Sequence, residues 1–166
     1  MRVPIRKPGK HTHEKPDPHI TQEKYNEMKQ NLEKMLKQVR PRLSKEVKRL
    51  ALMGDFSENA AYSIAKGKLR GLNQRILEVE DHLRRAIIIK KGGSSSSVKL
   101  GNTVVVEVDG VEKHYTILGS SEVDLEERII SHNSPLGKAL MNRRVGDNYS
   151  AVIGTKKKNF NILKVE

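Results

Sequence analysis

Two long apolar stripes at helical spacing, separated by one short break, constrain this chain more than any other feature of its sequence. The first stripe runs between residues 25 and 50 and the second between residues 61 and 86, with apolar side chains three and four positions apart in both. Such spacing places the apolar side chains on one face of a helix. Gly54 stands four residues after the end of the first stripe, in a position where glycine commonly ends a helix. Packing the two helices together buries both stripes, so the sequence predicts an antiparallel helical hairpin over residues 20–90.

The predicted hairpin is a rod with one end far from the rest of the chain. Each arm would be roughly 45 to 50 Å long at about 1.5 Å per residue. Thr21 stands where an N-cap of the first helix is expected. Pro41 interrupts the first stripe and predicts a bend there, because proline removes one helical hydrogen bond and crowds the preceding turn.

The chain beyond residue 90 changes character. Residues 90–97 read KKGGSSSS, which is typical of a linker, and we assign 91–98 to it. Asp109 and Gly110 form a D-G pair that favours a type I′ hairpin turn, and Ser134 and Pro135 suit the start of a short helix through Met141. Strands are predicted at 103–108, 112–118, 128–131, 149–153 and 160–165. Residues 99–166 are therefore expected to form a small α+β domain.

Composition narrows the classes of function. The chain has no cysteine, which excludes disulfides, thiolate metal sites and cysteine nucleophiles and is consistent with a reducing cytoplasm. No apolar run is long enough to cross a bilayer, so we expect a soluble cytoplasmic protein without a membrane partner. Residues 1–90 carry +10 of the net charge of +12. This excess indicates a polyanionic partner, although long exposed helices also need solvating charge.

Residues 1–19 are rich in proline, lysine and histidine and are expected to form a disordered basic arm. Three histidines, His11, His13 and His19, lie near Glu14 and Asp17 in this arm. A metal site is disfavoured here, because nothing in the local sequence would fix the geometry of the ligands.

The break between the two stripes holds two carboxylates in basic surroundings. Asp55 and Glu58 are the only acidic residues between positions 47 and 77. Their spacing is that of a capping box, which would satisfy two amides at the start of the second helix. The same spacing also places both carboxylates on one face at the end of a rod, where they could share a hard divalent cation such as Mg²⁺ or orient a water. The two interpretations are compatible.

Residues 54–62, GDFSENAAY, resemble the tip signature of the Gre transcript-cleavage factors, the GreA/GreB family. Residues 130–140, ISHNSPLGKAL, followed by VGD at 145–147, look like the C-terminal domain of the same family. The resemblance covers residues 20–166 and leaves the N-terminal arm outside. The Arg-Pro pair at 40–41 and the KLR run at 68–70 lean towards GreB.

The resemblance implies a mechanism as well as a fold. A coiled-coil hairpin would enter the secondary channel of bacterial RNA polymerase, while an FKBP-like α+β domain docks at its rim, with Ser134 and Pro135 in the docking region. The chain would not itself be an enzyme. It would stimulate Mg²⁺-dependent cleavage of backtracked nascent RNA by polymerase, with Asp55 and Glu58 as the catalytic residues that hold Mg²⁺ jointly with polymerase. We expect such a factor to act as a monomer.

Further positions follow from the resemblance. Three residues would support the carboxylates at the tip: Ser57, Asn59 and Tyr62. Four basic residues would contact phosphates of the nascent RNA 3′ segment without reading its bases: Lys66, Lys68, Arg70 and Arg75.

One departure from the family pattern leaves an alternative open. Ala61 stands where the family commonly has a third acidic residue, which favours a regulator that enters the same channel without cleaving RNA. An FKBP-type prolyl isomerase is disfavoured because that chemistry needs an aromatic-lined pocket, and residues 91–166 hold only Tyr115, Tyr149 and Phe160 as aromatic rings of that kind. A generic nucleic-acid-binding coiled coil would differ in that its binding does not require polymerase.

Overall fold

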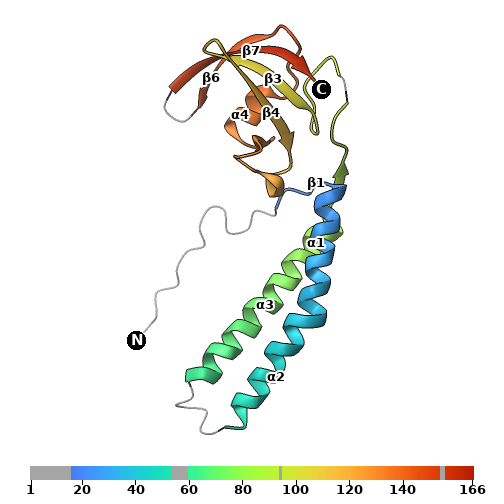
Figure 1. The fold of residues 1–166 in the computed structure, drawn as a ribbon, viewed down its shortest axis with the longest axis vertical. Helices are drawn as coiled ribbons and strands as arrows, with labels where there is room; N and C mark the ends of the chain where they lie inside the picture. Colours follow the sequence, from blue (N-terminus) through green and yellow to red (C-terminus); the bar gives the residue numbers. More distant parts are fainter. Residues whose placement is uncertain (1–15, 54–59, 94, 154–155) are drawn as a thin grey trace, which may run out of the picture.

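The computed structural model describes residues 16–53, 60–93, 95–153 and 156–166, and the side chains of 151–157 are not part of that description. A long helical hairpin and a mixed five-stranded sheet meet end to end at a narrow junction (Figure 1). This arrangement confirms the predicted α+β class with its N-terminal hairpin. Among the described residues, no helix has both the length and the apolar character that a membrane span requires.

The first arm of the hairpin is one continuous helical path made of α1 (Gln22–Lys34), η1 (Met35–Val39) and α2 (Arg40–Ala51). The second arm, α3 (Ala60–Arg85), returns antiparallel beside it (Figure 1). The first arm is roughly 45 Å long at about 1.5 Å per residue. Thr21 caps α1 as predicted, since its hydroxyl accepts a hydrogen bond of 3.2 Å from the amide of Lys24.

Proline at position 41 does not break the first arm. The residues just before it, η1, form a π-helical turn in which the amide of Arg40 donates to the carbonyl of Met35, five residues back. Pro41 has no amide to donate, and the wider π-helical turn lies just before it. The helix continues past Pro41 as α2.

The seam between the arms is narrow. Four side chains of α3 are buried: Ala65, Ile76, Val79 and His82. No side chain of α1, η1 or α2 is buried, and the apolar stripe of this arm is only half-covered. A pair of helices without further neighbours can enclose little more than one line of contacts.

The sheet has the strand order β5-β4-β3-β7-β6. Its strands are β3 (Thr103–Val108), β4 (Val111–Leu118), β5 (Ile129–Ser131), β6 (Asn148–Ile153) and β7 (Lys156–Val165). Only the β4–β5 pair is parallel. Asp109 and Gly110 join β3 to β4 with φ of 54° and 80°, as a type I′ turn requires. β7 begins four residues before its predicted start.

One face of the sheet is covered by α4 (Pro135–Leu140) (Figure 1). Between them lies a closed aliphatic core with one aromatic ring, formed by Val98, Val104, Val106, Val108, Ile117, Leu140, Phe160, Ile162 and Val165. Alternate positions of β3 supply three of these side chains, as the two-residue period of a strand predicts, and Val105 on the opposite face is buried as well.

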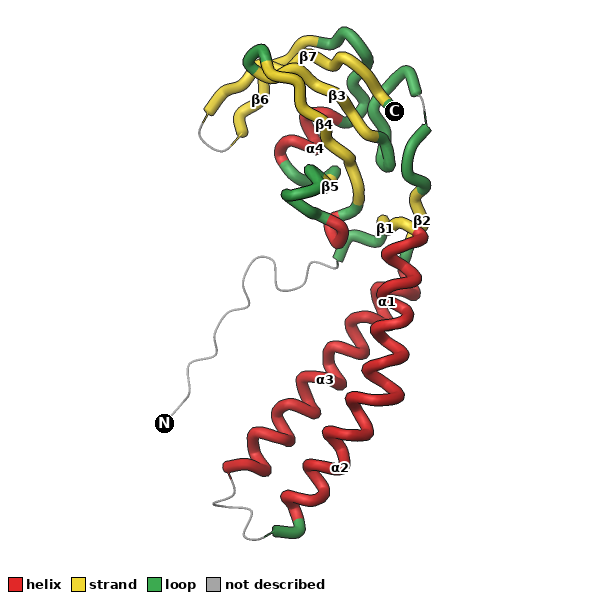
Figure 2. The backbone as a smooth tube through the Cα atoms, in the orientation of Figure 1, coloured by secondary structure: helices red, strands yellow, loops and turns green. Residues whose placement is uncertain are grey.

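A small parallel sheet that the sequence did not predict forms the junction. β1 (His19–Thr21) pairs with β2 (Ile87–Ile89), directly where α1 begins and α3 has ended (Figure 2). Ile20 is fully buried there. Residues 17–19 are thus built into the fold, unlike the disordered arm we expected up to residue 19, whereas residues 1–15 lie outside the described residues.

Side chains and backbone also tie the junction to the sheet domain. The carboxylate of Glu122, in the short 3₁₀ helix η2 (Ser120–Glu122), accepts hydrogen bonds from both the amide and the hydroxyl of Thr21, at 2.7 and 2.5 Å. On the linker side, the amide of Gly92 donates to the carbonyl of Gly101, and Asn102 donates to the carbonyl of Gly93. The start of the linker is therefore held against the domain that follows it.

Candidate functional site

The far end of the hairpin is the first candidate site. α2 ends at Ala51, and the amides of Leu52 and Met53 close its last turn on carbonyls of Arg49 and Leu50. Leu52 and Met53 are 82% and 66% exposed, although both are large and apolar. Two neighbouring apolar side chains are therefore presented to solvent at the end of this arm.

The predicted tip residues Asp55, Ser57, Glu58 and Asn59 lie outside the described residues, as does Gly54. The structure does place the helices on either side of them: α2 ends and α3 begins at the pole of the hairpin remote from the sheet (Figure 1). The chain connecting α2 to α3 thus starts and ends far from the folded C-terminal domain.

Tyr62 and Lys66 open the second arm. Tyr62 is half-buried in the first turn of α3, and the ammonium of Lys66 lies 5.7 Å from the centre of its ring. This distance is within the range of a cation–π contact. Ala61, beside them, is exposed and offers only a methyl group.

The four basic residues predicted to contact RNA do not share one side of α3. At about 100° per residue, Lys66 and Arg70 line one flank of the apolar seam, while Lys68 and Arg75 line the other. All four are exposed, and Arg75 forms an ion pair of 3.6 Å with Glu78. Across the described part of the chain, Lys68 and Arg70 have no acidic partner, so their charge is free to attract an anion.

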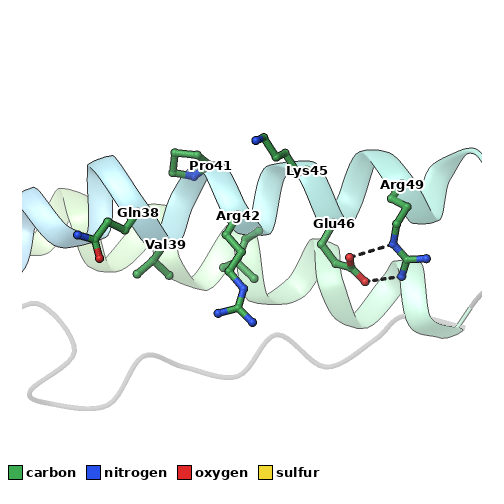
Figure 3. Close-up of a pocket in the computed structure, with 8 residues that line it drawn as sticks. Gln38, Val39, Pro41, Arg42, Lys45, Glu46 and Arg49 are labelled. Atoms are coloured by element: carbon green, nitrogen blue, oxygen red, sulfur yellow. Dashed lines mark hydrogen bonds and ion pairs between the residues drawn. The ribbon is translucent and has the colours of Figure 1, made fainter.

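The first arm adds basic residues that the sequence analysis did not single out. An open hollow of about 860 Å³ runs along α2 beside Pro41, and Arg42, Lys45 and Arg49 lie along its margin (Figure 3). Glu46 holds Arg49 through two hydrogen bonds, at 2.7 and 3.1 Å. Their helical spacing could have indicated this surface, because Arg42, Lys45 and Arg49 recur every three to four residues.

In the C-terminal domain, Ser134 and Pro135 start α4 as predicted. The hydroxyl of Ser134 accepts from the amide of Gly137 at 3.0 Å and donates to the carbonyl of Ser131 at 2.6 Å. Pro135 is exposed at the first helical position. The structure thus explains both residues as a helix start, and their part in docking stays a prediction.

The junction contains a second group of chemically active side chains. Asp17 lies between His19 and His132, with carboxylate-to-Nδ1 distances of 2.9 and 3.4 Å. Burial by itself raises the pKa of Asp17, but hydrogen bonds from Ser120 and His19 outweigh it and hold that pKa below its ordinary value. Asp17 is therefore a carboxylate over the whole neutral range. The sequence could not reveal this group, because more than one hundred residues separate His132 from the other two.

Comparison with known proteins identifies the family to which the chain belongs. The GreA/GreB N-terminal model matches residues 19–88, and the GreA/GreB C-terminal model matches residues 93–166. The chain is 40% identical over 130 residues to the transcription elongation factor GreA of Macrococcus caseolyticus, covering 77% of this chain and 82% of that protein. It is 36% identical over 130 residues to GreA of Thermomicrobium roseum, covering 77% and 83%.

Among solved structures, the crystal structure of GreA factor homolog 1 from Thermus thermophilus matches with 27% identity and a TM-score of 0.40, over 86% of this chain and 94% of that one. The assignment rests on the sequence matches, which cover both regions of the molecule. The predicted lean towards GreB stays a prediction, since the relatives named here are GreA proteins. The chain belongs to the GreA/GreB family of transcription elongation factors.

Proposed function

We propose that this elongation factor inserts its hairpin into the secondary channel of bacterial RNA polymerase and stimulates cleavage of backtracked nascent RNA. The observation that carries the proposal is the position of the hairpin pole. The chain segment with Asp55 and Glu58 is joined to helices that end there, roughly 45 Å from the junction at about 1.5 Å per residue. A rod of this length can bring two carboxylates into a deep channel while the sheet domain stays outside. Such a factor would work in the cytoplasm, where polymerase does.

The donor set suits a magnesium ion shared between two proteins. Asp55 and Glu58 offer only oxygen, which Mg²⁺ prefers, but two carboxylates cannot fill its octahedral shell. The site therefore fits a jointly held ion and not one bound by this chain alone. When bound, Mg²⁺ would activate water and stabilise the leaving oxygen in phosphodiester hydrolysis. Asp55 and Glu58 would orient the water and contribute negative charge, and polymerase would perform the hydrolysis.

The residues around the tip would assist in two ways. Ser57, Asn59 and Tyr62 would support the carboxylates, with Tyr62 already packed under Lys66. The nascent RNA 3′ segment would lie along the basic flanks of α3, where Lys68 and Arg70 are exposed. Contacts to phosphates fit this task, because the factor must act at any sequence.

The sheet domain would dock at the rim of the channel near the start of α4. Pro135 is exposed and Ser134 fixes the local backbone through its two hydrogen bonds. A rigid surface at this point would set how deeply the hairpin enters. A single copy of the chain contains both the rod and the docking surface, so the factor would act as a monomer.

A non-cleaving regulator of the same channel is the second candidate, favoured by one observation. Ala61 is exposed in the first turn of α3 and provides no charge where the family commonly has an acidic residue. With fewer carboxylates, the hairpin would obstruct the channel more effectively than it would assist catalysis.

The two candidates separate in an assay with a reconstituted backtracked elongation complex. We expect the wild-type chain to release a short 3′ RNA fragment, and Asp55→Asn and Glu58→Gln each to abolish most cleavage while binding polymerase normally. Raising Mg²⁺ should partly restore cleavage, because the substitutions weaken an ion site and keep the size of the side chain. The matched control is Asp124→Asn with Glu126→Gln, which makes the same change of charge on the sheet domain.

Normal cleavage by a variant that carries both Asp55→Asn and Glu58→Gln would contradict the proposed mechanism. A wild-type chain that binds polymerase and slows elongation without producing the fragment would establish the regulator instead. A chain that binds RNA but does not bind polymerase at all would remove both candidates.

A further inference from the structure

Three potential ligands for a metal ion meet at the junction between the hairpin and the sheet domain. Asp17, His19 and His132 each place one oxygen or nitrogen atom within 4.8 Å of the others. Asp17 and His19 come from the segment that leads into α1, while His132 follows β5 in the sheet domain (Figure 2). The group therefore bridges the two regions of the molecule.

The distances fit a tetrahedral ion. Nitrogen and oxygen ligands about 2.0–2.2 Å from zinc lie roughly 3.3 Å from each other in a tetrahedral site. Oδ1 of Asp17 lies 2.9 Å from Nδ1 of His19, and Oδ2 of Asp17 lies 3.4 Å from Nδ1 of His132. The two imidazole rings are 5.4 Å apart between centroids and edge-to-face. The remaining edge, between the ligand atoms of His19 and His132, is no longer than 4.8 Å, and His19 has the most exposed side chain of the three.

Hydrogen bonds around the group fix the carboxylate. The side chain of Asp17 is only 5% exposed, and its Oδ2 accepts from the amide and hydroxyl of Ser120 at 2.9 and 3.2 Å. Its Oδ1 accepts from the amide of His19 at 3.2 Å. The carbonyl of Asp17 lies 3.0 Å from Nε2 of His82, a buried residue of α3. Partners of this kind orient metal ligands and strengthen metal binding in proteins.

The backbone around the group is closely packed at two glycines. A Cβ at Gly119 would lie 1.7 Å from the carbonyl oxygen of His19, and a Cβ at Gly137 would lie 2.1 Å from the carbonyl oxygen of Ser131. The first glycine lets the segment of Asp17 and His19 approach the end of β4, and the second lets α4 press against the backbone next to His132. The three ligands are thus carried by backbone that has little freedom to move.

We propose that Asp17, His19 and His132 form a binding site for Zn²⁺ or a similar first-row transition-metal ion that clamps the hairpin to the sheet domain. Two imidazoles and a carboxylate suit such an ion, whereas Mg²⁺ and Ca²⁺ prefer all-oxygen sites. Three protein ligands leave one tetrahedral position for water. The bound ion replaces the hydrogen bond between His19 and Asp17 and the ion-pair contact between His132 and Asp17 with stronger links, and it holds the rod at one angle to the sheet domain.

Zinc titration of the full-length chain by isothermal calorimetry tests the site. The chain is produced without a polyhistidine tag and with His11→Ala and His13→Ala, because these arm residues could bind zinc by themselves. We expect one ion per chain, with affinity reduced by about tenfold or more by Asp17→Asn, His19→Ala or His132→Ala. The matched control is His114→Ala, which removes a surface histidine of β4 paired with Glu112 and should leave the affinity unchanged.

Equal zinc affinity in the background and in all three ligand variants would overturn the site, as would equal heats for Mg²⁺ and Zn²⁺. A variant that fails to fold would be recognised by its circular dichroism with chelator present. For that case His132→Asn, which keeps a polar side chain of smaller size, gives the same comparison and should also lose affinity.

The clamp is tested separately by distance measurements. The chain has no cysteine among its residues, so two introduced ones, Lys45→Cys in α2 and Glu112→Cys in β4, accept spin labels uniquely. Zinc should narrow the distance distribution between the labels, and His132→Ala should abolish the narrowing. Zinc that binds at the site but leaves the distribution unchanged would overturn the clamp.

Discussion

The hairpin and the sheet domain bury their side chains to very different degrees. The largest fully buried side chains among the described residues are in or beside the sheet domain and at the junction, and none of them belongs to the hairpin arms. In the sheet domain, α4 closes one face of a five-stranded sheet over a continuous core. In the hairpin, two helices share one seam, and the first arm has no buried side chain.

The difference reflects what each architecture can do. A closed core stabilises a compact shape, because each added apolar side chain is surrounded by others. Each added turn makes a two-helix rod longer, but it buries only the few apolar side chains that this turn contributes to the half-covered seam. The rod therefore depends on its attachment, where Ile20 is fully buried and Glu122 binds Thr21. The sheet domain and the junction therefore provide the stability, and the hairpin provides the length.

The largest expected effect is on the closed core. Ile117→Ala should lower the free energy of unfolding of the sheet domain by about 2–5 kcal/mol, because Ile117 is fully buried and its loss leaves a cavity. Leu72→Ala in the half-covered seam of α3 should cost less, since the site is open to solvent and can collapse. Hydrogen exchange followed by mass spectrometry reports each region separately. If the two substitutions lowered the free energy of unfolding equally, the seam of the hairpin would be as closed to solvent as the core of the sheet domain.

The junction is the next most sensitive region. Gly119→Ala places a methyl group 1.7 Å from the backbone oxygen of His19, and neither backbone can yield without opening the contact. We expect a loss of about 1–3 kcal/mol, within the usual range for overpacking. Faster hydrogen exchange should appear in β1 and η2, with the core of the sheet little changed. Protection of β1 that stays at the wild-type level would show that the junction contributes little to holding the rod.

The fold was predictable where the signal is local. The type I′ turn at Asp109 and Gly110 and the helix start at Ser134 depend on residues within four positions of each other. The two helical stripes are long enough for their period to be unambiguous. Each of these features was confirmed, with strand ends shifted by a few residues.

The junction was not predictable for the opposite reason. β1 and β2 have three residues each, too few to show a period, and each is a strand only because the other lies beside it. His19 appeared to belong to a polar arm until His132 and Asp17 were placed next to it. The π-helical turn before Pro41 likewise depends on how the helix accommodates a missing amide, which the spacing of apolar residues does not encode.

A smaller effect on the free energy of unfolding is expected from Tyr149, at the edge of the sheet core. Burial raises the pKa of Tyr149 to about 12, and no partner for its buried hydroxyl exists within the described residues. The ring stacks on Phe160 at 5.2 Å, and Arg143 lies 4.9 Å from its centre. Tyr149→Phe keeps both contacts and removes the unsatisfied hydroxyl, so it should raise the free energy of unfolding by about 1 kcal/mol.

The same substitution should change the dependence on pH. A raised pKa means that folding favours the neutral phenol, so this contribution is fully present below about pH 10 and is lost as the pH rises towards 12. Urea unfolding at neutral pH and at alkaline pH should therefore show the wild-type chain losing stability relative to Tyr149→Phe above pH 10. A gap that does not widen with pH would mean that Tyr149 ionises normally.

The smallest change in stability is expected in the hairpin, and it is an increase. Gly71 lies in the middle of α3, and a Cβ there would have no atom within 4 Å. Gly71→Ala should stabilise the helix by roughly 0.5–1 kcal/mol, because alanine loses less conformational freedom on folding. Slower hydrogen exchange should be confined to α3 and the arm that packs on it, with the sheet unchanged. Gly119→Ala is the matched opposite, the same added methyl group in a crowded site. If Gly71→Ala also slowed exchange throughout the sheet core, the two regions would unfold as one unit, and the contrast between a stable domain and a dependent rod would not hold.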